Sequence, residues 1–130
     1  MLSEQHAGAF DGSAKPNPGN MKIGGWIATP TRRIIKEFSE EIGYGTANEA
    51  EYRACIRLLE ECKKLGITNI SVRSDSELVV NQINGVSKTK DPKMKMLKGL
   101  VMNLCDGGIK LNISHVPRKY NTMADRLSHQ

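Results

Sequence analysis

The chain has 130 residues, and at the usual length of about 100 to 200 residues per domain this predicts one compact domain. Apolar residues make up 38% and charged residues 25%, which is typical of a globular protein and excludes fibrous, disordered and membrane-embedded chains. The net charge of +5 favours a polyanionic partner such as nucleic acid, although basic surfaces that bind nothing are also common. We therefore predict a single domain, residues 1–130.

The three cysteines, Cys55, Cys62 and Cys105, show neither a disulfide framework nor the Cys-x-x-Cys spacing of a zinc site. Their pattern therefore predicts a reducing compartment. Residues 1–6 lack the basic start and apolar run of a secretory signal, and no segment approaches the roughly 18 apolar residues of a membrane span. Together these features predict a cytoplasmic protein with no membrane partner.

Three strands in an antiparallel meander are predicted for the first third of the chain. Residues 7–10 are followed by a tract rich in turn-forming residues, 11–20, so the first strand should stop at Asp11. Two further apolar runs, 24–29 and 33–42, are separated by a Pro-Thr-Arg tripeptide in the pattern of a hairpin.

An amphipathic helix is predicted for residues 47–65, because apolar side chains recur there at spacings of three and four and Gly66 follows as a C-terminal cap. Extending the apolar stripe backward reaches Glu51. A carboxylate on the inner face of a helix is costly to bury unless a cation or donor meets it. The other charged side chains are expected to form a solvated face: Glu49, Arg53, Glu60, Glu61, Lys63 and Lys64.

The second half of the chain continues with alternating elements. The predicted elements are a strand at 69–74, helices at 76–83 and 91–104, a strand at 109–116 and a helix at 121–128. The element order is βββαβααβα, which predicts an α/β fold.

Four carboxylates are candidates for one functional cluster. Asp11 and Asp75 each follow a predicted strand, and such strand ends gather ligands in α/β sheets; Glu51 and Asp125 can join them if their helices pack at that edge. Four carboxylates without cations would repel one another, so the cluster would suit divalent ions, with magnesium as the simplest choice. Taken singly, a structural explanation is favoured for three of them: Asp11 as a turn residue, Asp75 as a helix cap and Asp125 as a solvent-facing acid. Only the joint arrangement favours a functional cluster.

Six short motifs follow one another along residues 7–128. They are Phe10-Asp11-Gly12-Ser13, Asn17-Pro18-Gly19, Thr46-Ala47-Asn48-Glu49-Ala50-Glu51, Ser74-Asp75-Ser76, His115-Val116-Pro117-Arg118 and Asn121-x-x-Ala124-Asp125. Their types and order resemble those of type 1 ribonuclease H. The resemblance implies a ribonuclease H-like fold, with a five-stranded mixed sheet whose first three strands are antiparallel and with helices on both faces. It also implies an endonuclease that hydrolyses the RNA strand of RNA/DNA hybrids and leaves 5'-phosphate and 3'-hydroxyl ends.

The same resemblance implies roles for individual residues. Asp11 would bridge two magnesium ions, with manganese as a possible substitute. Asp125 would help to hold the ion that activates water, and Glu51 and Asp75 the ion at the leaving group. Arg118, seven residues before Asp125, stands where many relatives with a short final loop have an arginine, so it would meet a phosphate or a product group. An exposed loop cation is the alternative for Arg118.

Substrate contacts are implied in the same way for Gly12, Ser13, Asn17, Thr46 and Asn48, with Thr46 on the DNA strand and the others on RNA. Ala47 departs from the family, which commonly has asparagine there. Residues 88–119 carry eight basic side chains against two acidic ones, which suits phosphate contacts, although a solvated face is an equally good reading. We expect a monomer that needs no protein partner.

Two family features are not expected in this chain. The segment from Pro117 to Asn121 is too short to carry the histidine of the long-loop enzymes, and His115 falls within a strand. A basic protrusion after the helix that follows Asp75 is also absent from the sequence. The rival hypotheses are a silent module that only binds nucleic acid, which retention of four acids opposes, and a 3'-to-5' exonuclease, whose Asp-x-Glu motif is missing at Asp11.

Overall fold

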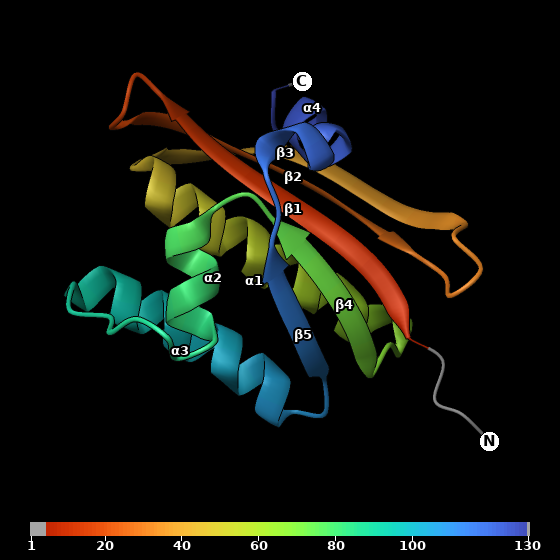
Figure 1. The fold of residues 1–130 in the computed structure, drawn as a ribbon. Helices are drawn as coiled ribbons and strands as arrows, with labels where there is room; N and C mark the ends of the chain where they lie inside the picture. The colour runs from red at the N-terminus through yellow and green to blue at the C-terminus, as the bar shows by residue number, and fades with distance from the viewer. Residues whose placement is uncertain (1–4, 130) are drawn as a thin grey trace.

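The structure, a computed structural model, describes residues 5–129 and shows one five-stranded sheet with four α-helices (Figure 1). The elements in chain order are β1 (His6–Lys15), β2 (Gly19–Ala28), β3 (Ile34–Gly45), α1 (Ala47–Leu65), β4 (Asn69–Ser74), α2 (Glu77–Ile83), α3 (Pro92–Asp106), β5 (Lys110–His115), a 3-10 turn η1 (Arg118–Tyr120) and α4 (Thr122–Ser128). The predicted element order is confirmed.

The sheet has the strand order β3-β2-β1-β4-β5, and the prediction of a mixed sheet with three antiparallel strands is confirmed. β4 pairs in parallel with both β1 and β5. Helices α1, α2 and α3 lie on one face and α4 lies on the other (Figure 1). Successive side chains of β1 point to opposite faces of the sheet. Phe10 belongs to the large core with Leu58 of α1, whereas Ala9 packs with Trp26 and Leu127 in a small core under α4.

The end predicted for the first strand is wrong, because β1 does not stop at Asp11 but continues to Lys15. It pairs with β2 throughout, with Asp11 opposite Gly24 and Lys15 opposite Asn20. Backbone pairing with a neighbouring strand overrides the low strand propensity of small polar residues, so only the residues between the two strands form the turn. Pairing of β1 with β4 does end at Ala9, so Asp11 still lies just beyond the parallel part of the sheet.

Glu49 and Glu61 are also not solvated as expected, since each is only 5% exposed. The Arg57 Nε lies 2.9 Å from a Glu61 carboxylate oxygen, and the Arg53 Nε lies 2.8 Å from one of Glu49. Both pairs have the i,i+4 spacing that brings side chains together on a helix. Because arginine side chains pair with these two carboxylates, both can be buried. More of the α1 surface is therefore buried than its apolar stripe alone predicts.

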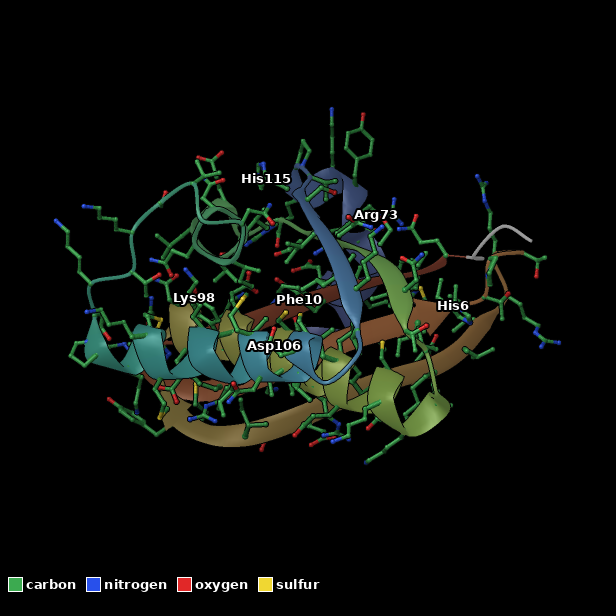
Figure 2. All side chains as sticks on the ribbon, turned by 90° about the horizontal axis from the view of Figure 1, so that it is seen from below. His6, Phe10, Arg73, Lys98, Asp106 and His115 are labelled. Atoms are coloured by element: carbon green, nitrogen blue, oxygen red, sulfur yellow. The ribbon has the colours of Figure 1, made fainter. Side chains whose placement is uncertain are left out.

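Helix ends follow the sequence signals closely. Gly66 ends α1 with a φ of 73°, and the Asp91 carboxylate accepts the Lys93 amide at the start of α3. At α2 the cap is Ser76, whose hydroxyl accepts the Val79 amide, so Asp75 is not the capping residue. α3 lies beside α1 and carries Lys98 and Asp106 (Figure 2). None of the described helices is long and apolar enough to cross a membrane.

Candidate active site

Three carboxylates from separate elements meet beside the centre of the sheet. Asp11 comes from β1, Glu51 from the second turn of α1, and Asp75 from the residue after β4, and one oxygen of each lies within 4.8 Å of the others. Asp11 is 3% exposed and Glu51 6%. The Gly12 amide donates to Glu51 Oε1, and a Cβ at residue 12 would overlap the backbone of Ala50. Glycine therefore allows α1 to lie directly on β1, which places Glu51 beside Asp11.

Helix α4 brings the fourth carboxylate from the opposite face of the sheet. Asp125 and His129 form a second group with Asp11 in which the ligand atoms again lie within 4.8 Å of one another. The Asn121 amide nitrogen donates to the Phe10 carbonyl at 3.0 Å, and the Ser128 hydroxyl donates to Asp11 Oδ2 at 2.9 Å. Both ends of α4 are thus tied to β1, and Asp11 is common to the two groups.

Burial gives this cluster unusual electrostatics. Loss of solvent, together with the nearby charge of Asp75, raises the pKa of Asp11 to about 7. The pKa of Glu51 is also well above its usual value, first because of burial and then because of the Asp11 charge. Asp125 Oδ1 is buried without a hydrogen-bond partner among the described residues. Buried, mutually repelling carboxylates with an unpartnered oxygen fit divalent cations, which favour oxygen ligands.

Arg118 lies at the rim of the cluster. Its Nε donates to Asp75 Oδ2 at 3.1 Å, and its side chain is 74% exposed. The hydrogen bond from Arg118 and the charge of Asp75 hold the pKa of the guanidinium above its usual range. His115 lies apart from the cluster, with its Nδ1 3.8 Å from a Glu77 oxygen. Arg118 therefore presents a permanent cation to solvent beside a candidate ligand.

The residues expected to touch substrate lie on β1, the following turn and the start of α1. Thr46 caps α1 by accepting the Glu49 amide at 3.1 Å, and the Asn17 side-chain oxygen accepts the Ala47 amide at 3.0 Å. These bonds tie the turn after β1 to the beginning of α1. All members of the set precede Glu51 in the sequence: Gly12 and Ser13 are half-buried, and Asn17, Thr46 and Asn48 are exposed.

A basic groove lies between the α2–α3 loop and α3. Its basic lining consists of Lys88, Lys90, Lys95 and Lys98, none of which forms an ion pair with another residue in the described part of the chain. Lys93 differs, because its Nζ lies 3.5 Å from Glu49 Oε1. Four like charges along one open groove suit a polyanionic backbone.

His129 is a candidate functional residue that sequence analysis missed. Its Nε2 lies 3.3 Å from Asp125 Oδ1. The available signal was the i,i+4 spacing of the two residues, which places them on one face of a helix. That spacing had no significance until α4 was seen to pack against Asp11.

Comparisons with known proteins agree with this fold. Residues 9–130 match a family described as Reverse transcriptase-like. The chain is 36% identical over 121 residues to "Ribonuclease HI" of Halobacterium salinarum, covering 93% of this chain and 61% of that protein. It is 38% identical over 120 residues to "Bifunctional protein Rv2228c" of Mycobacterium tuberculosis, covering 92% of this chain and 33% of that protein. It thus spans less than two thirds of the length of these curated relatives.

The solved structure of LC11-RNase H1 in complex with RNA/DNA hybrid is similar throughout. Its TM-score to this chain is 0.92 at 35% sequence identity, and the match covers 96% of this chain and 94% of that one. Because the chain matches LC11-RNase H1 in sequence, in fold and in length, it belongs to the type 1 ribonuclease H family.

Proposed function

We propose that this protein is a metal-dependent endonuclease that hydrolyses the RNA strand of RNA/DNA hybrids and leaves 5'-phosphate and 3'-hydroxyl ends. The convergence of Asp11, Glu51 and Asp75, with Asp125 on the other side of Asp11, is the observation that carries the proposal. The similar LC11-RNase H1 structure contains an RNA/DNA hybrid, which supports the same class of substrate here.

Two cations, each held in part by Asp11, would account for the two groups of ligands. Glu51 and Asp75 would complete one position and Asp125 the other, with magnesium as the ion and manganese as a substitute. Divalent ions bound there would lower the pKa of the attacking water and stabilise charge on the departing 3' oxygen.

The chain itself holds these ligands in place before substrate arrives. The Ser128 hydroxyl fixes Asp11 at 2.9 Å, and the Gly12 amide fixes Glu51. Each donor restricts the rotation of a carboxylate, which lowers the cost of organising the site for reaction. The exposed guanidinium of Arg118 would contact a phosphate of the substrate or product while it remains beside Asp75.

Selection of RNA would come from the polar residues around Glu51. Gly12, Ser13, Asn17 and Asn48 would read 2'-hydroxyls and the RNA backbone, and Thr46 would contact a phosphate of the DNA strand. The basic groove along α3 would add phosphate contacts farther from the reacting bond. We propose that a single copy is sufficient, because all four carboxylates come from one chain, and that the protein is cytoplasmic, as its free cysteines suggest.

Cleavage of matched substrates tests this function. An end-labelled RNA/DNA hybrid, the same RNA as a single strand, and duplex DNA are incubated with the protein and magnesium. Rapid cleavage of the hybrid RNA alone is expected, and Asp75→Asn serves as the inactive control. Hybrid binding without cleavage would instead identify a silent binding module, and preferential cleavage of either other substrate would overturn the proposed specificity.

A further inference from the structure

We propose that His129 supplies a nitrogen ligand to the cation held by Asp11 and Asp125, and that this position therefore binds manganese more tightly than magnesium. The inference rests on the proposed function, because it concerns one of the two cation positions of that site. It adds a residue of a different chemical type to a cluster otherwise made of carboxylates.

The spacing of the donor atoms fits a shared ion. One oxygen of Asp11, one of Asp125 and one ring nitrogen of His129 all lie within 4.8 Å of one another. Adjacent ligands of an octahedral ion at about 2.1 Å are about 3.0 Å apart, and opposite ligands are about 4.2 Å apart. The 3.3 Å between His129 Nε2 and Asp125 Oδ1 therefore falls in the range for neighbouring ligands of one ion.

The orientation of these two groups points to the same arrangement. Asp125 Oδ1 is buried and has no hydrogen-bond partner among residues 5–129, although the His129 nitrogen is close enough to donate. A hydrogen bond from the imidazole N–H of His129 would satisfy this carboxylate oxygen, but the two groups are not oriented to form it. The Asp125 oxygen and the His129 nitrogen thus lie side by side without a hydrogen bond between them. Two ligands of one cation are arranged in this way.

The fold holds His129 at the cluster. The Ser128 hydroxyl contacts both Asp11 Oδ2 at 2.9 Å and the Asp125 carbonyl at 2.8 Å, so the residue before His129 is fixed on both sides. The His129 amide donates to the Arg126 carbonyl at 3.1 Å. Its side chain is 33% exposed, which leaves a path for an ion from solvent.

A nitrogen ligand changes which metal the position prefers. Manganese, a first-row transition metal, accepts an imidazole nitrogen more readily than magnesium does, because magnesium favours oxygen ligands. The group of Asp11, Glu51 and Asp75 contains only carboxylates. The two positions should therefore differ, with manganese favoured beside His129.

Pulsed electron paramagnetic resonance of bound manganese tests the ligand directly. The full chain is loaded with manganese, and coupling of the metal to imidazole nitrogen is measured for wild type, His129→Ala and His129→Gln. His115→Ala is the matched control, because His115 contacts Glu77 outside the cluster. We expect nitrogen coupling in wild type and His115→Ala and its loss in both His129 variants.

Calorimetric titration with manganese and with magnesium gives a second readout. The His129 variants should lose about tenfold or more in manganese affinity, a loss typical when a group that organises a metal site is removed, with little change for magnesium. Absence of nitrogen coupling in wild type, or its persistence in folded His129 variants, would overturn the proposal and leave His129 as an ion-pair partner of Asp125. Circular dichroism establishes that each variant is folded.

Hybrid cleavage with magnesium, measured on the same preparations, separates the two proposals. Cleavage without nitrogen coupling would overturn only the role of His129. Nitrogen coupling without cleavage of any hybrid would support the metal ligand and contradict the proposed function.

Discussion

Replacing Asp11 with asparagine should stabilise the metal-free protein near neutral pH even though it abolishes hybrid cleavage. The substitution removes one of the charges that burial forces together, and it keeps an oxygen that can accept the Ser128 hydroxyl. Loss of cleavage follows because an amide is a poor ligand for a hard cation. Gain of stability follows because the charged form of Asp11 is costly in the folded state.

The size of the effect follows from the pKa of Asp11, which rises from 3.8 to about 7 on folding. Between these values the folded protein holds a proton that the unfolded chain has lost, so stability falls as pH increases. Below about 3.8 the penalty is absent, and above about 7 it is complete. At about 1.36 kcal/mol per pKa unit, the full penalty is roughly 4 kcal/mol, an upper limit because Glu51 shares the repulsion.

Urea unfolding in EDTA, followed by circular dichroism at about pH 5 and about pH 8, measures this dependence. Wild type should be less stable at the higher pH, and Asp11→Asn should show a smaller difference. Asp106→Asn is the control, because it removes the same charge from an exposed position at the end of α3. Equal stability of wild type at both pH values, or an unchanged difference in Asp11→Asn, would refute the reasoning.

Three further variants test separate parts of the site. Asp75→Asn should abolish cleavage while hybrid affinity in a gel-shift assay persists, and turnover like wild type at saturating magnesium would remove Asp75 from the ligands. Lys95→Ala with Lys98→Ala should weaken hybrid binding and reduce the slope of log affinity against log salt by about 2, whereas Lys110→Ala, away from the groove, should change it less. Arg118→Ala should lower kcat about tenfold, or about 1.4 kcal/mol, more than it raises KM in steady-state assays; a rise in KM alone would make Arg118 a simple phosphate contact.

Local sequence signals predicted most of the fold because the elements carry them internally. The apolar spacing through Leu58 and the cap at Gly66 define α1 without reference to the rest of the chain. The same stripe predicted that Glu51 would be buried, which the structure confirms. The full length of β1 was not predictable from local propensity, since it depends on pairing with β2 as far as Lys15.

Features that depend on distant residues were harder to predict. Glu61 is buried because cations reach it from two elements, including Lys36 of β3 as well as Arg57 of its own helix. His129 has a role only because α4 lies against β1, and no pattern within the short helix indicates that packing. The four carboxylates were easier to associate, since Asp11 and Asp75 were each expected at a strand end, where such groups gather, and the helices that carry Glu51 and Asp125 could pack at that edge.

Mapping of the products from an internally labelled RNA/DNA hybrid tests the central claim most directly. The protein should cut the RNA strand at internal positions, leave 5'-phosphate and 3'-hydroxyl ends, and spare the DNA strand. Cleavage should stop in EDTA and in Glu51→Gln, which keeps the shape of a ligand without its charge. Cyclic phosphate ends, cleavage of the DNA strand, or undiminished cleavage in EDTA would contradict a carboxylate-held, metal-dependent ribonuclease H.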